Sequence, residues 1–260
     1  MTDSASSDLD PTAVARIESL AASVSAEFKA TRRLLSFDEW FALLCAEPTV
    51  HARSAAQFVR DAFEHFGTRS VRTPKGQIQR YCLFDSEFDG WHRLVGQEEA
   101  QNELYEAIEG FVRLGRTNKL LLLHGPNGSA KSTMLESLQR ALEVYSRTER
   151  GALYRFAWVF PNRQHSTGGI GFSASQALQD ALGEETFARL GSDQVDARVL
   201  DEVKDHPLYL LPVPDRRALL EEVLGSEKNF VISDAILHGD LSHRNRKVFD
   251  ALLATHGGDL

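Results

Sequence analysis

Residues 120–133 constrain the fold more than any other part of the chain. They read Leu-Leu-Leu-Leu-His-Gly-Pro-Asn-Gly-Ser-Ala-Lys-Ser-Thr, and from Gly125 to Ser132 they match the phosphate-binding pattern G-x-x-x-x-G-K-[ST], except that Ala130 replaces the second glycine. The apolar run before the loop is typical of a strand buried in a parallel sheet. Apolar residues at three- and four-residue spacing after it predict a helix from Lys131. We therefore predict a strand, a phosphate loop and a helix.

The residue types of this loop suit a nucleoside triphosphate with Mg²⁺. Backbone N–H groups and the helix N-terminus would converge on the phosphates, and small side chains would keep the backbone close. Lys131 would place a cation on the β- and γ-phosphates, Ser132 would bind Mg²⁺ through its hydroxyl, and Thr133 would extend the helix N-terminus toward the α-phosphate. Where position 130 needs a positive φ, alanine costs about 1–2 kcal/mol that glycine avoids. The predicted nucleotide-binding residues of the loop are Gly125, Pro126, Asn127, Gly128, Ser129, Ala130, Lys131, Ser132 and Thr133.

The overall charge and the cysteine content narrow the classes of partner. The chain has 260 residues and a formal net charge of −8, which argues against nonspecific nucleic-acid binding and against docking on an anionic membrane. It contains two cysteines, Cys45 and Cys82, and neither an apolar signal segment at its start nor a run near the ~20 apolar residues of a membrane span. We expect a reduced, cytoplasmic protein that binds neither nucleic acid nor membrane.

The first ninety residues predict a tail followed by a helical region. Residues 1–11 are rich in Ser and Asp without periodicity, which predicts a disordered tail. The helical region covers residues 12–90. Within it, Ser36 and Glu39 form a capping-box pattern before a helix. A further helix is predicted up to Phe66, with Gly67 as its C-terminal stop, and a short strand is predicted over residues 78–84.

Residues 91–260 are predicted to form the nucleotide-binding domain. A short apolar segment ending in Gly96 opens a helix that leads directly to the phosphate-loop strand. Alternating aromatic residues predict a strand over residues 154–160. A short apolar run follows at residues 208–211, and a helix is predicted over residues 215–224.

Several motifs beyond the loop carry a family resemblance. They are Phe37-Asp-Glu-Trp40, Leu94-Val-Gly-Gln-Glu-Glu99, Leu142-Glu-Val-Tyr-Ser-Arg-Thr148, Gly151-Ala-Leu-Tyr154, His206-Pro-Leu-Tyr-Leu-Leu-Pro212 and Asp240-Leu-Ser-His-Arg-Asn-Arg246. With them, the chain from about residue 36 onward resembles the AAA+ portion of the bacterial PrkA serine protein kinase family. This resemblance implies an α/β fold, a P-loop NTPase of AAA+ type with a parallel sheet flanked by helices, behind the helical N-terminal region. It also implies that Leu94, Val95 and Gly96 lie beside the adenine ring of ATP.

The resemblance further implies ATP-dependent regulation or phosphorylation of proteins, with protein substrates or partners. The resemblance also implies homo-oligomers, but only for full-length members of the family. Family members are much longer, and their kinase-assigned region lies C-terminal to the matching part. We therefore expect this chain to be truncated, with the AAA+ domain incomplete at its C-terminus, and to bind ATP while turning it over slowly or not at all.

Two alternatives and one weaker motif stay open. Residues 230–234 form an apolar run that ends in Asp234. Asp234 could orient a metal ion, but an ordinary surface carboxylate is the favoured interpretation. We therefore assign no catalytic residue. Residues 238–245 fit H-x-D-x-x-x-x-N, which allows a kinase-like phosphotransferase that uses Asp240 and Asn245. A nonenzymatic, nucleotide-responsive interaction module is the other alternative.

Overall fold

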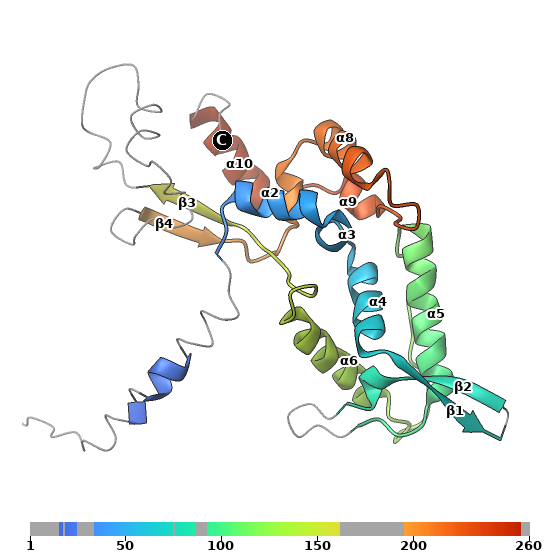
Figure 1. Cartoon of the computed structure of the whole chain (residues 1–260). Coiled ribbons are helices and arrows are strands. Elements are labelled where there is room, and N and C mark those ends of the chain that lie inside the picture. Colours follow the sequence, from blue (N-terminus) through green and yellow to red (C-terminus); the bar gives the residue numbers. More distant parts are fainter. Residues whose placement is uncertain are drawn as a thin grey trace, which may run out of the picture.

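The computed structural model describes residues 16–17, 19–24, 34–74, 76–86, 93–161 and 195–255. Helices predominate along these residues (Figure 1). The named elements, in chain order, are α2 (Phe37–Ala46), α3 (Pro48–His51), α4 (Ala55–Phe66), β1 (Thr68–Thr73), β2 (Gly76–Tyr81), η1 (Cys82–Phe84), α5 (Glu98–Leu114), α6 (Lys131–Ser146), β3 (Ala157–Pro161), β4 (Val195–Leu200), η4 (Pro207–Leu210), α8 (Val213–Leu224), α9 (Asp234–His238) and α10 (His243–Thr255).

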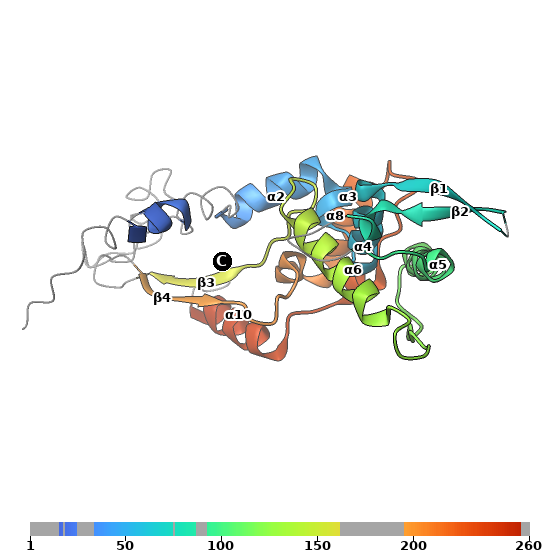
Figure 2. The same ribbon diagram turned by 90° about the horizontal axis from the view of Figure 1, so that it is seen from below.

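The described strands form two separate antiparallel pairs. In the first, β1 pairs with β2 in the register that joins Thr68 to Tyr81 and Thr73 to Gly76. In the second, β3 pairs with β4, and Ala157 lies opposite Leu200. Figures 1 and 2 agree that the two pairs lie on opposite sides of α2, α4 and α6.

The predicted fold class, a P-loop NTPase of AAA+ type with a parallel sheet flanked by helices, is wrong. Both sheets in the described part of the chain have two strands, and both are antiparallel. Residues 120–123, predicted as a buried strand of the parallel sheet, form neither strand nor helix, and Leu120 and Leu122 are 90% and 79% exposed. A buried strand needs neighbours on both edges and layers on both faces. No described strand pairs with this run, and Leu120, Leu121 and Leu122 remain exposed to solvent.

The helix signals that depend on neighbouring residues are confirmed. The hydroxyl of Ser36 accepts a hydrogen bond from the backbone N–H of Glu39, whose carboxylate accepts one from the backbone N–H of Ser36, so the predicted capping box is present. Helix α4 ends at Gly67, where φ is 75°. Helix α6 begins at Lys131 as expected. These contacts span only a few residues, so tertiary packing is not needed to specify them.

The predicted strands outside the phosphate-loop region are confirmed in part. Strand β2 covers the first part of the predicted strand 78–84, but the chain then turns into the short 3-10 helix η1. Strand β3 covers the second part of the predicted strand 154–160. The predicted helix 215–224 corresponds to α8, whereas the apolar run 208–211 lies largely in the 3-10 helix η4.

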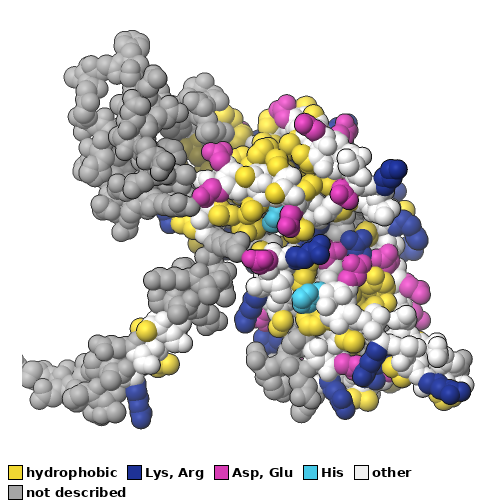
Figure 3. Space-filling view, in the orientation of Figure 1, with side chains coloured by type: hydrophobic (Ala, Val, Ile, Leu, Met, Phe, Trp, Pro, Cys, Tyr) yellow, Lys and Arg dark blue, Asp and Glu magenta, His cyan; other side chains and the backbone are white. Residues whose placement is uncertain are grey.

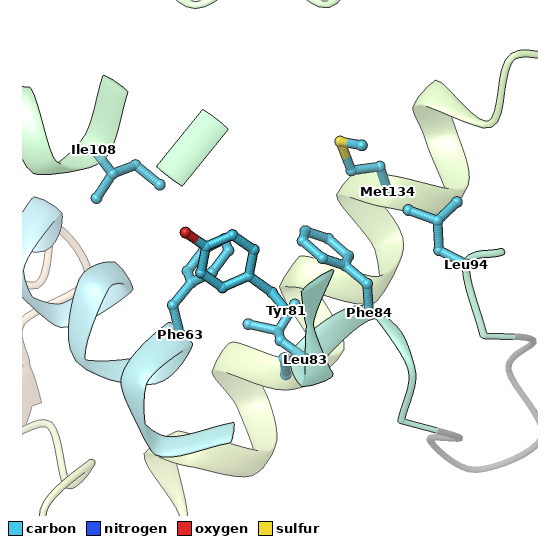
Figure 4. Packing of buried hydrophobic residues seen from close by; sticks show 8 residues of the cluster. Phe63, Tyr81, Leu83, Phe84, Leu94, Ile108 and Met134 are labelled. Atoms are coloured by element: carbon cyan, nitrogen blue, oxygen red, sulfur yellow. The ribbon is translucent and has the colours of Figure 1, made fainter. Parts of the chain in front are cut away.

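A hydrophobic cluster, called here the loop-side cluster, packs η1 between α4, β2, α5 and α6 (Figure 4). It takes side chains from both sides of the predicted domain boundary at residue 91. That boundary falls in residues 87–92, and the predicted tail 1–11 falls at the start of the chain, so both lie outside the described residues. The buried members of the loop-side cluster are Phe63, Tyr81, Leu83, Phe84, Leu94, Ile108, Met134 and Ala141.

A second cluster forms where α2 packs against η4, α8 and α9. Trp40 and Leu44 of α2 meet Leu208 and Leu220 in it, and all four side chains are buried. Hydrophobic side chains gather on this face around α2 and α8, whereas acidic and basic side chains are interspersed over the rest (Figure 3). None of the helices in the described part of the chain has the length and apolarity needed to cross a membrane.

Candidate functional site

The predicted phosphate loop leads into α6 through a strained backbone. Ala130 is the N-cap residue of α6 and adopts the left-handed conformation, with φ 59° and ψ 21°. Gly128 also has a positive φ of 79°. A non-glycine residue in this region costs about 1–2 kcal/mol. Such strain tends to occur at ligand-binding and switch sites, where the surrounding structure holds it.

The first turn of α6 presents backbone donors without a side-chain cap. The methyl side chain of Ala130 cannot accept a hydrogen bond, so the N–H groups in the first turn of α6 lack the usual capping oxygen. These groups and the helix dipole favour an anion at this end. Ser132, in the same turn, is exposed, as are Pro126, Asn127 and Gly128 in the loop before it. The loop is therefore accessible to a ligand from solvent.

The ammonium group of Lys131 folds back into the loop. Its Nζ donates hydrogen bonds to the carbonyl oxygens of Gly125 (2.9 Å) and Pro126 (2.7 Å) and to Oγ of Ser129 (3.0 Å). Ser129 Oγ in turn donates to the carbonyl oxygen of Pro126 (2.8 Å). Three neutral acceptors thus hold a cation beside the uncapped helix start. A bound phosphate would give this cation an anionic partner and so replace bonds to neutral oxygens by an ion pair.

The predicted adenine-side segment, residues 94–96, lies against the start of α6. Leu94 is 2% exposed and belongs to the loop-side cluster with Met134 (Figure 4). Leu123 and Ala130, before and within the phosphate loop, pack on the same cluster. Val95 is instead 70% exposed. The tertiary structure therefore brings the segment 94–96 and the predicted phosphate loop together. The side chain of Val95 stays exposed to solvent.

Ser132 is the one residue predicted to bind Mg²⁺. Among the described residues, no group of three or more His, Cys, Asp or Glu side chains could hold a metal ion. Mg²⁺ commonly keeps several waters and binds one or two protein groups together with substrate phosphates. The exposed hydroxyl of Ser132 fits a metal ion that arrives with a nucleotide.

Asp234 lies away from the phosphate loop. Its backbone N–H donates to the carbonyl oxygen of Gly115 (2.9 Å), which is the C-cap of α5. Figure 1 shows α9 near this end of α5, whereas α6 begins near the other end, beside β1 and β2. Asp234 is the first residue of α9. It therefore lies too far from the start of α6 to orient a metal ion at Ser132.

Asp240 and Asn245, the pair in the phosphotransferase-like motif, serve different contacts. Asn245 is 4% exposed, and its Nδ2 donates to Asp201 Oδ1 (2.9 Å) and Asp205 Oδ2 (2.7 Å). Its Oδ1 accepts a hydrogen bond from Trp158 Nε1 (3.1 Å), which fixes the orientation of the amide. Asp240 is largely exposed and pairs with Arg246. The motif spacing therefore corresponds to a buried structural amide and an exposed ion pair.

Comparison with known proteins finds one partial similarity. The chain is 31% identical over 121 residues to the ATP-dependent protease PrkA of Bacillus subtilis (strain 168). The chain is distantly similar to PrkA. The match covers 46% of this chain and 17% of that PrkA, so the chain spans only a small part of its relative. No family model matches the chain, and no solved structure matches it.

The sequence interpretation missed two polar residues that hold the segment 94–96. Arg80 and Gln101 both donate hydrogen bonds to its backbone. Gln101 had a detectable signal, because it lies at helical spacing with the apolar residues Leu104 and Ile108. A polar residue on a buried stripe normally has a hydrogen-bonding role. Neither residue lies in a motif that carries the PrkA resemblance.

Proposed function

We propose that this chain binds ATP with Mg²⁺ between residues 125–133 and the segment 94–96. The observation that carries the proposal is the left-handed Ala130 at an uncapped helix start, with the ammonium of Lys131 beside it. That conformation lowers the stability of the free chain, and a bound phosphate would use the backbone donors that it exposes.

Each residue of the proposed site has a defined task. Lys131 leaves its three neutral acceptors for the β- and γ-phosphates, and Ser132 contributes its hydroxyl to the coordination of Mg²⁺. The backbone from Gly128 to Thr133 donates to the phosphates, with Thr133 nearest the α-phosphate. Val95 offers its exposed apolar side chain to the adenine ring, and Gly96 lets the ring approach the backbone.

The proposed role of ATP binding is the regulation or phosphorylation of proteins by a PrkA-like protein. The relative's name describes an ATP-dependent protease, whereas the family resemblance of the motifs points to a serine protein kinase. Both activities require ATP and act on proteins, so ATP binding is the part that they share. We propose, as part of the same role, that the PrkA-like protein acts on protein substrates and associates with copies of itself.

A titration with mant-ATP and Mg²⁺ tests the site. We expect Lys131→Ala to raise the Kd by about 10- to 100-fold, because a charge-assisted contact contributes about 1.5–3 kcal/mol. Lys119→Ala is the matched control, since it removes the same charge from an exposed position outside the loop. Equal affinities for the two variants would exclude the proposed site.

A nonenzymatic, nucleotide-responsive interaction module is a second candidate. The position of Asp234 favours it, because the backbone N–H of this residue bonds to the carbonyl oxygen of Gly115 at the far end of α5 from the phosphate loop. On this alternative, the chain binds ATP without hydrolysing it. Phosphate release measured with saturating ATP separates the two, since a turnover that Lys131→Ala abolishes would favour the enzyme.

A further inference from the structure

Three hydrogen bonds hold the backbone of the segment 94–96. The N–H of Leu94 donates to the carbonyl oxygen of Phe84 (2.9 Å), and Arg80 Nη2 donates to the carbonyl oxygen of Leu94 (2.9 Å). Gln101 Nε2 donates to the carbonyl oxygen of Gly96 (3.0 Å). The first bond joins backbone to backbone, whereas the other two depend on side chains that a substitution can remove.

Gln101 connects this segment to β2. Its side chain is fully buried, and its Oε1 accepts a hydrogen bond from the backbone N–H of Tyr81 (3.3 Å). Both ends of the amide are therefore engaged, one by Tyr81 and the other by Gly96. Gly96 and Gln97 have successive positive φ values of 81° and 63°, a turn that isolated backbone disfavours for Gln97. The bond from Gln101 supports this turn from inside the protein.

Arg80 is held by two carboxylates while it contacts the segment. Its guanidinium lies 2.8 Å from Asp85 and 3.3 Å from Glu98, and its side chain is 11% exposed. A planar guanidinium with several fixed partners keeps each N–H in one direction. The carbonyl of Leu94 therefore has a defined position relative to both β2 and α5.

We propose that Gln101 and Arg80 are positioning residues for base recognition in the nucleotide site. They hold the segment 94–96 without contacting the nucleotide and so determine where Val95 and its backbone meet the adenine ring. This inference rests on the proposed ATP binding. It separates the site into two parts, because the phosphate contacts of Lys131 depend on α6 and not on Gln101.

Inorganic triphosphate distinguishes the two parts of the site. It has the phosphates of ATP but no base, so it reports on residues 125–133 alone. We expect Gln101→Met to weaken ATP binding by about tenfold, the usual effect of one lost buried hydrogen bond. The affinity for triphosphate should stay within about twofold, and the preference for ATP over GTP should fall.

Asn102→Ala is the matched control for this experiment. Asn102 neighbours Gln101 on α5, and its Nδ2 donates to the carbonyl oxygen of Gln79 in β2 (2.6 Å). It thus makes the same kind of contact between helix and strand without bonding to the segment 94–96. We expect its ATP, GTP and triphosphate affinities to match those of the wild type. Arg80→Lys, which keeps a charge opposite Asp85, is the second test variant and decides the question where Gln101→Met fails to fold.

Calorimetric titrations of the full chain with Mg²⁺ and each ligand give the outcomes. A selective loss of ATP affinity in Gln101→Met or Arg80→Lys supports the proposal. Equal losses for ATP and triphosphate, or no loss for either, overturn it while leaving ATP binding itself intact. A wild-type chain that binds neither ligand overturns this inference together with the proposed function.

Discussion

Nη1 of Arg53 donates a hydrogen bond to the hydroxyl of Tyr145 (3.0 Å), which joins the start of α4 to the last turns of α6. The same guanidinium pairs with Asp61 (2.9 Å), donates to the carbonyl oxygen of Arg150 (2.6 Å) and lies 4.9 Å from the ring centre of Phe58. The start of α6 is held separately, by the packing of Met134 in the loop-side cluster. The helix that carries Lys131 is therefore fixed at both ends.

We expect Arg53→Met to lower the free energy of unfolding by about 3 kcal/mol. The loss of a buried charge leaves Asp61 and the Arg150 carbonyl without this partner, although Asp61 keeps its contact with Arg60. Urea unfolding followed by circular dichroism measures the change. Arg140→Met is the control, because its ion pair with Glu143 is exposed and contributes less than about 1 kcal/mol. Similar changes for both variants would refute a special role for Arg53.

Ala130→Gly is expected to stabilise the chain while other alanine-to-glycine changes destabilise it. Glycine avoids a steric cost of about 1–2 kcal/mol at φ 59°, and loses part of this gain to its greater freedom in the unfolded chain. The net gain should be about 0.5–1 kcal/mol in thermal or urea unfolding. Ala107→Gly, inside α5, should instead cost about 1 kcal/mol. A loss of stability in Ala130→Gly would contradict the left-handed assignment.

The stability of the chain should depend on pH through His206. Burial lowers the pKa of His206 to about 4, and its Nδ1 accepts a hydrogen bond from the N–H of Leu208 (3.1 Å). Between pH 6.5 and 4 the unfolded chain binds a proton that the folded chain excludes, so this contribution to stability falls as the pH is lowered. Above pH 6.5 both states are neutral at this residue and the contribution is constant.

His206→Asn isolates this effect, because asparagine keeps an acceptor for the Leu208 N–H and does not titrate. We expect the melting temperature of the wild type to fall more steeply than that of the variant between pH 6.5 and 5. Parallel curves for the two proteins would show that His206 does not carry the dependence.

Asn245→Asp and Asp240→Asn should have very different effects. The first removes two hydrogen-bond donors and adds a carboxylate beside Asp201 and Asp205, so it should lower the free energy of unfolding by about 3 kcal/mol or more. The second breaks only the exposed pair with Arg246 and should cost less than about 1 kcal/mol. Urea unfolding measures both.

The same Asp240→Asn variant tests the phosphotransferase alternative. We expect no change in phosphate transfer from γ-labelled ATP to protein, because Asp240 and Asn245 serve separate structural contacts. Transfer that the wild type performs and this substitution abolishes would revive the alternative with Asp240 as its base.

Contacts between close neighbours in the chain were accessible from the sequence. The capping box of Ser36 and Glu39, the helix stop at Gly67 and the helix start at Lys131 each depend on residue types within a few positions. The sequence also predicted that alanine at position 130 would be costly if its φ were positive. Only the structure supplied the value of that angle.

The leucines at residues 120–123 show where sequence reasoning failed. An apolar run records that side chains favour burial, but it does not record which strand would pair with it. In the described part of the chain that partner is missing, and the sheets that do form are antiparallel. The predicted parallel sheet therefore depended on non-local pairing that the run itself does not encode.

The sequence by itself determined where several helices begin and end and which loop carries the phosphate-binding pattern, because short-range hydrogen bonds and backbone preferences act between neighbours. Only the tertiary structure decided that Leu94 packs against Met134, that Gln101 bridges Tyr81 and Gly96, and that Asn245 meets Trp158 across 87 positions of the chain. Such contacts arise from packing of distant segments, and the spacing of residues along the chain carries no direct record of them.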